Sequence, residues 1–82
     1  MNEAQAVAAA NAAREQKEVP EEARFGSAER QYIELGDADP EKPSPVRDVL
    51  VWLVRYVFSG GRWVELAVED ATGEVVRVRR SR

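Results

Sequence analysis

The sequence predicts a small α+β domain in which one N-terminal helix packs on an antiparallel sheet of three to four strands. Three observations support this fold class. An alanine-rich segment with a helix-start signal opens the chain. Alternating apolar segments fill its last third, and glycine-bearing turns separate them. One helix on one face of such a sheet buries both apolar surfaces economically. A chain of 82 residues forms a single small domain, 1–82, with a core of few side-chain layers.

The helix is predicted to span residues 2–17. Asn2 is a good N-cap, and Gln5 lies three residues later, as in a capping box. The interior is mostly alanine, the best helix former. Helical spacing puts four residues on the side expected to face the sheet, namely Ala4, Val7, Ala8 and Ala12.

The middle of the chain is less regular. Pro20 indicates the end of the helix. Residues 30–35 are interpreted as a strand that could begin at 23–25, with Gly26 and Ser27 marking a bend or bulge. Residues 36–47 are a proline-rich loop, which is long for so small a domain and is therefore expected to be mobile or functional.

A three-stranded meander is predicted over residues 49–80, and Val49–Phe58 is its first strand. This strand is apolar on both faces except at Arg55, which indicates a central strand or one covered on both sides. The even-numbered face carries Trp52, Val54, Tyr56 and Phe58, and the odd-numbered face Val51, Leu53 and Val57. An alanine helix cannot cover the aromatic face alone, so we expect sheet curvature, the segment 18–45 or a second copy of the chain to cover the rest.

Two turns complete the meander. Ser59–Arg62 contains Gly-Gly, which supplies the positive φ angles of a tight hairpin. In the strand Trp63–Glu69 that follows, alternation puts Trp63 on the side opposite Val64, Leu66 and Val68. Packing of Trp63 on Tyr56 or Phe58 across the hairpin is the open alternative. Asp70–Gly73 has the signature of a second turn. The last strand is Val75–Arg79, with two residues expected inward and two outward: Val76 and Val78, and Arg77 and Arg79.

Composition argues against catalysis. The chain has no cysteine and no histidine, which removes thiol chemistry, thiolate zinc sites and the commonest general base. No catalytic, cofactor-binding or metal-binding residues are predicted, and no cofactor is expected. Residues 1–45 carry ten Asp/Glu against five Lys/Arg, and residues 46–82 carry five against seven. This imbalance is too weak to define a nucleic-acid or membrane binder.

No membrane span or export signal is expected. The longest apolar run, Val49–Phe58, is far shorter than the roughly 20 residues of a spanning helix. The N-terminus lacks a basic region followed by a bulky apolar one. We therefore expect a cytoplasmic protein, or an extracytoplasmic one if a signal was removed.

Three stretches of the sequence together resemble a PepSY-type domain, a family related in shape to the cystatin-like α+β roll. They are the alanine-rich helix start Glu3–Ala9, the aromatic strand Trp52–Tyr56 and the closing turn Asp70–Val76. The resemblance covers about residues 2–17 and 49–80, and the closing turn is its most distinctive part. It implies a non-enzymatic regulatory or inhibitory module and supplies no catalytic residues. Family members are typically extracytoplasmic, whereas this chain shows no export signal.

The surface features favour binding, and five residues are candidates for contact with a partner. Trp63 and Arg62 follow the hairpin turn, and tryptophan and arginine dominate interface energetics. Tyr56 lies on the neighbouring strand, and Arg77 and Arg79 point outward from the last one. The predicted function is a non-catalytic protein-binding module. Two alternatives remain: a small nucleic-acid-binding domain that uses the C-terminal arginines, and a self-associating subunit, such as a homodimer, that pairs through the apolar sheet.

Overall fold

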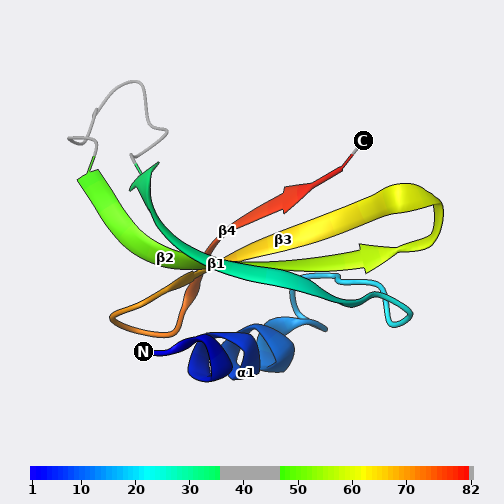
Figure 1. Ribbon diagram of the computed structural model, residues 1–82, viewed down its shortest axis with the longest axis horizontal. Coiled ribbons are helices and arrows are strands. Elements are labelled where there is room, and N and C mark those ends of the chain that lie inside the picture. Colours follow the sequence, from blue (N-terminus) through cyan, green and yellow to red (C-terminus); the bar gives the residue numbers. More distant parts are fainter. Residues whose placement is uncertain (36–46, 82) are drawn as a thin grey trace.

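The computed structural model describes residues 1–35 and 47–81 as one helix packed against a four-stranded antiparallel sheet (Figure 1). The sheet follows the chain in the order β1-β2-β3-β4. Its elements are α1 (Glu3–Ala13), β1 (Arg24–Leu35), β2 (Arg47–Phe58), β3 (Arg62–Glu69) and β4 (Val75–Arg80), with a short 3-10 turn, η1 (Ser59–Gly61), between β2 and β3. The predicted α+β fold and its meander are confirmed. The proline-rich loop lies outside the described residues, except that Arg47 already begins β2.

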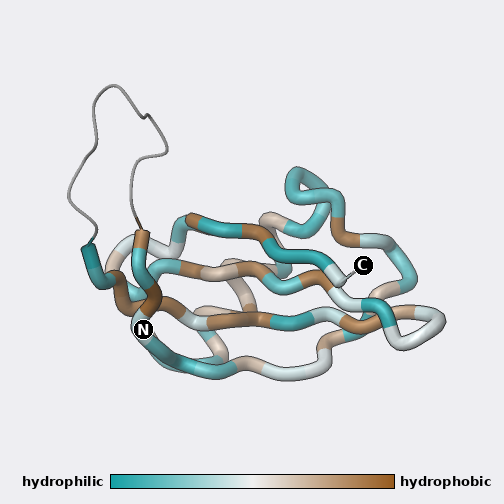
Figure 2. Tube along the Cα trace, turned by 90° about the horizontal axis from the view of Figure 1, so that it is seen from above, coloured by the Kyte–Doolittle hydropathy of each residue, from teal (hydrophilic) through white to brown (hydrophobic). Residues whose placement is uncertain are grey.

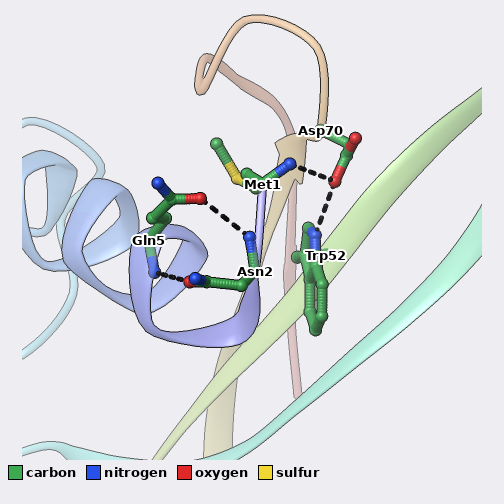
Figure 3. A network of polar contacts seen from close by, with 5 residues as sticks. All are labelled: Met1, Asn2, Gln5, Trp52 and Asp70. Atoms are coloured by element: carbon green, nitrogen blue, oxygen red, sulfur yellow. Dashed lines mark hydrogen bonds and ion pairs between the residues drawn. The ribbon is translucent and has the colours of Figure 1, made fainter.

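Local hydrogen bonds close the start of α1 and the end of the turns that follow it. At the start, Gln5 N donates to Asn2 Oδ1 at 2.8 Å and Asn2 N donates to Gln5 Oε1 at 2.9 Å, which confirms the capping box (Figure 3). At the end, Val19 N donates to the Arg14 carbonyl at 3.0 Å, and Glu18 has a left-handed φ of 57°. This is a Schellman-type closure. The regular helix therefore ends at Ala13, earlier than predicted, and a chain of turns continues to residue 18.

The prediction of which face of α1 meets the sheet is wrong. Ala6 and Ala10 are fully buried, whereas Ala4, Ala8 and Ala12 are exposed. Alanine occupies nearly every side of this helix, so apolar spacing gives no preferred direction. In the observed orientation, the polar residues Asn11 and Arg14 contact the core, and the spacing of apolar residues does not predict these contacts.

The main core lies between the sheet and α1, around Tyr56. This side chain is fully buried, and its hydroxyl donates to Asn11 Oδ1 at 2.6 Å. The Arg14 guanidinium lies 4.6 Å from the ring centroid and also donates to the Ala23 carbonyl at 2.6 Å. Burial raises the pKa of the Tyr56 hydroxyl, and the positive charge of Arg14 partly offsets this. The helix and part of the 18–45 segment, Val19 and Ala23, together cover the aromatic face.

A smaller apolar cluster lies on the sheet face opposite α1. It consists of Ile33, Val49, Val51, Leu53 and Ala67, and all five are buried. Hydrophobic and hydrophilic stretches are mixed along the chain trace (Figure 2). Val76 joins this cluster instead of facing the helix as predicted, because a bulge opposite Ala67 and Val68 interrupts the alternation of β4. Val78 packs on the helix side as expected.

The turn Asp70–Gly73 connects β3 to β4 and holds a polar contact to the core. Gly73 has a φ of 76°, and its N–H donates to the Glu69 carbonyl at 2.8 Å. Asp70 Oδ1 accepts from Trp52 Nε1 at 2.9 Å and from the Met1 amino group at 3.3 Å (Figure 3). The hydrogen bond from Trp52 is the main cause that lowers the pKa of the Asp70 carboxyl. The predicted turn is therefore confirmed and anchors both the N-terminus and β2.

Candidate binding face

The hairpin between β2 and β3 positions Trp63 on the face that α1 does not cover. Gly60 and Gly61 adopt φ angles of 77° and 72°, which reverse the chain within η1. Trp63 then pairs with Val57 in the sheet register. Its backbone is fixed by Ser81, whose Oγ accepts from Trp63 N at 2.8 Å and whose N donates to the Trp63 carbonyl at 2.9 Å. The expected orientation of Trp63, away from Val64 and the helix, is thus confirmed.

Arg55 and Glu65 hold the Trp63 side chain from within the same face. The Arg55 guanidinium lies 4.0 Å from the centre of the Trp63 ring. It donates to Glu65 Oε2 through Nη2 at 2.9 Å and Nε at 3.3 Å. Glu65 is only 6% exposed, and these two hydrogen bonds from Arg55 pair its buried carboxylate. A stacked cation tied to a buried carboxylate is a rigid arrangement, because the planar guanidinium is satisfied on two sides.

Two arginines of β4 extend this surface. The register puts Arg79 directly opposite Glu65 and Arg77 opposite Ala67. Arg77 Nε is buried and has no hydrogen-bond partner within the described part of the chain. We call the set the Trp63 patch; it consists of Arg55, Val57, Trp63, Glu65, Arg77 and Arg79. With three arginines and one glutamate it carries two net positive charges, and Val57, 41% exposed, adds an apolar edge.

The structure brings together three of the five predicted contact residues. Trp63, Arg77 and Arg79 share one face, as alternation predicted. Arg62 lies on the other side of the hairpin, 4.9 Å from the Phe58 ring centroid. Tyr56 as a partner-binding residue needs correction: its side chain has no exposed surface, because the helix and Val19 cover it.

Arg77, Arg79 and Arg80, the C-terminal arginines that the structure describes, do not all lie on one face of the sheet. Arg80 points to the helix side and donates to the carbonyls of Lys17 at 2.6 Å and Glu18 at 3.1 Å. It therefore supplies hydrogen-bond donors to carbonyl groups at the end of the turns that follow α1. Only Arg77 and Arg79 of this group belong to the Trp63 patch.

Sequence reasoning missed the roles of Arg55 and Glu65. One signal was present: Arg55 is the single charged residue in the apolar core of β2. The turn Ser59–Arg62 also fixes the hairpin register, which sets Arg55 opposite Glu65. Counting outward from the turn would have identified this pair as an ion pair.

Comparisons with known proteins add no assignment. The chain matches no family model, no curated protein and no solved structure. Within residues 1–35 and 47–81, no group of three or more His, Cys, Asp and Glu side chains is placed to hold a metal ion. None of the described helices has the length and apolar character needed to cross a membrane.

Proposed function

We propose that the chain is a non-catalytic protein-binding module that recognises its partner through the Trp63 patch. The observation that carries the proposal is the Arg55–Trp63–Glu65 arrangement on a sheet face without a helix. Tryptophan and arginine are the side chains that most often dominate interface energetics. Holding both in place before binding reduces the conformational entropy lost on association.

The charge of the patch suggests the chemistry of the partner surface. Its net charge of two positive units favours an acidic rim, and Trp63 with Val57 favours an apolar depression at the centre. Glu65 is already satisfied by Arg55, so it does not repel an approaching carboxylate as a free glutamate would. Arg77 and Arg79 are the side chains expected to meet acidic groups.

The resemblance to PepSY-type domains suggests which kind of partner the module binds. It rests on the stretches Glu3–Ala9, Trp52–Tyr56 and Asp70–Val76, and it stays a prediction. If it reflects common ancestry, the partner is an enzyme that the module regulates or inhibits. The proposed binding surface does not depend on this resemblance, since it derives from the side chains of β2, β3 and β4.

The test compares two aromatic truncations on different faces of the sheet. Tagged wild-type chain, Trp63→Ala and Phe25→Ala are used to capture proteins from a lysate of the source organism. Phe25 is a matched control because it is 49% exposed and pairs with Tyr56, away from the Trp63 patch. We expect one protein that survives high-salt washing, that Phe25→Ala retains and that Trp63→Ala loses. Equal capture by a well-folded Trp63→Ala would overturn the assignment.

A nucleic-acid-binding function is the second candidate, because Arg55, Arg77 and Arg79 surround an aromatic ring on an uncovered sheet face. Sheets with basic and aromatic side chains bind single strands by stacking and backbone contacts. This function requires oligonucleotide binding that weakens steeply with salt. An absence of binding at low salt, measured by fluorescence anisotropy, would remove it.

Self-association through the apolar sheet face, the remaining alternative, lacks the surface it needs. Within the described residues, β2 contributes only Val57 to the large exposed hydrophobic side chains. Val51 on the same face is fully buried, and Leu53 is 8% exposed. The excess apolar surface expected from the sequence is therefore already buried, and this face is not proposed as a dimer contact.

A further inference from the structure

The outer edge of β1 is a long strand edge without a neighbour in the described sheet. β1 spans 12 residues and pairs only with β2. The backbone groups that point away from β2 can therefore pair with another strand. Tyr32, in the second half of β1, is 69% exposed, more than any other large hydrophobic side chain among residues 1–35 and 47–81.

The charges of the two sheet edges differ. β1 carries two positive and two negative residues: Arg24, Glu29, Arg30 and Glu34. β4, the other edge, has six residues, three of them arginine and none acidic. Two β4 edges would repel each other, whereas two β1 edges can be complementary. Symmetric pairing of β1 also closes the assembly at two copies, while pairing of β1 with β4 would continue indefinitely.

We propose that two copies of the chain pair antiparallel through their β1 edges, with the two-fold axis at Tyr32. The two four-stranded sheets would then form one continuous sheet. In this register Tyr32 lies opposite Tyr32 of the second copy. Arg30 lies opposite Glu34 of the second copy, and the symmetry repeats this pair on the other side of the axis.

Side-chain direction permits this register. Directly opposed residues of an antiparallel pair share a face. Every second residue of β1 lies on the same face, and this set includes Arg30, Tyr32 and Glu34. Their partners on β2 are Trp52, Leu50 and Asp48, respectively. They therefore lie on one face, the one that carries α1, since Trp52 packs against the core beneath the helix.

Neighbouring registers are less favourable. An axis at Glu29 or at Arg30 would set like charges opposite each other, and an axis at Gln31 would leave Arg30 opposite Tyr32. The axis at Tyr32 would also relieve an unfavourable pair within one copy. Glu34 is directly opposite Asp48, and two carboxylates in that position repel. Arg30 of the second copy would bring a positive charge to this acidic pair.

The register can be read by cross-linking, because the chain has no cysteine of its own. Opposed residues in an antiparallel pair have Cα atoms about 4.5–5.5 Å apart, within the reach of a disulfide. Oxidised Tyr32→Cys is therefore expected to form a covalent dimer of two 9.2 kDa chains. Gln31→Cys is the matched control: its two copies would sit two positions out of register and should not cross-link.

Solution mass and charge exchange complete the test. Light scattering of the wild type at high concentration is expected to give twice the 9.2 kDa chain mass. Arg30→Glu or Glu34→Arg should each weaken dimerisation about tenfold, since each breaks two symmetric pairs and sets like charges together. The double variant should restore it. Glu29→Arg changes a residue that lies opposite the uncharged Leu35 of the second copy in this register, so it should have no effect.

Two results would overturn the proposal. A wild-type mass of one chain at high concentration would exclude the dimer. A dimer in which Gln31→Cys cross-links and Tyr32→Cys does not would exclude this register. The inference does not depend on the function proposed for the Trp63 patch, which lies on β2, β3 and β4 and would stay free in the dimer.

Discussion

Replacing Arg55 by leucine should destabilise the fold, because it leaves the Glu65 carboxylate buried without its partner. Hydrogen bonds to charged groups contribute about 1.5–3 kcal/mol. The Arg55 side chain is 39% exposed, and solvent screening reduces this to about 1–2 kcal/mol. Loss of the stack on Trp63 adds about 0.5–1 kcal/mol. Arg55→Leu is therefore expected to cost about 2 kcal/mol, which corresponds to a fall in Tm of about 8–16 °C for a domain of this size.

Urea unfolding followed by far-UV circular dichroism measures this loss, and a double-mutant cycle isolates its cause. Arg55→Leu/Glu65→Leu removes both charges and should lie within about 1 kcal/mol of the wild type, since apolar residues often replace a buried ion pair without loss. Unfolding of Arg55→Leu at the wild-type urea concentration would show that Arg55 does not stabilise Glu65. A double variant that lost as much as the two single variants together would show that the two side chains are uncoupled.

Two further substitutions test the helix end and the Asp70 contact. Glu18→Gly should raise the free energy of unfolding by about 0.5–1 kcal/mol in urea titrations, because glycine adopts the φ of 57° without steric cost; Glu18→Ala, which keeps a Cβ, should bring no such gain. The lowered pKa of Asp70 means that the ionised carboxylate stabilises the fold above the unfolded-state pKa near 3.8, and this contribution is lost as pH falls through the lower folded-state pKa. As the pH is lowered from 5 to about 2.5, the free energy of unfolding should therefore fall less for Asp70→Asn than for the wild type. Urea titrations at each pH measure this, and an equal fall in both proteins would contradict the role assigned to Asp70.

Local signals in the sequence predicted most of the fold. The capping box at Asn2 and the turns at Ser59–Arg62 and Asp70–Gly73 depend on residues within a few positions of one another. The bulge at Gly26 was also predicted, and β1 shifts register there, between Phe25 and Ser27. These features could be read directly because each has a short-range physical cause.

Features set by tertiary packing could not be read in this way. The rotation of α1 follows no apolar stripe, since alanine lies on nearly all its sides. The β4 bulge that turns Val76 away from the helix has no glycine to mark it. Tyr56 was proposed as a partner contact because an alanine helix alone cannot cover the aromatic face of β2. The sequence does not show that Val19 and Ala23 complete the cover and leave Tyr56 fully buried. The side of the sheet on which Trp63 lies was predicted correctly, because its strand alternates cleanly.

The two tryptophan side chains can report whether the Trp63 patch contacts the partner. They lie on opposite faces: Trp63 stacks with Arg55, and Trp52 donates to Asp70 beneath the helix side. ¹⁵N-labelled protein is titrated with the partner recovered by capture, and the two indole N–H signals are followed by NMR. We expect the Trp63 signal to shift while the Trp52 signal stays in place. A shift of Trp52 with an unchanged Trp63 would contradict it.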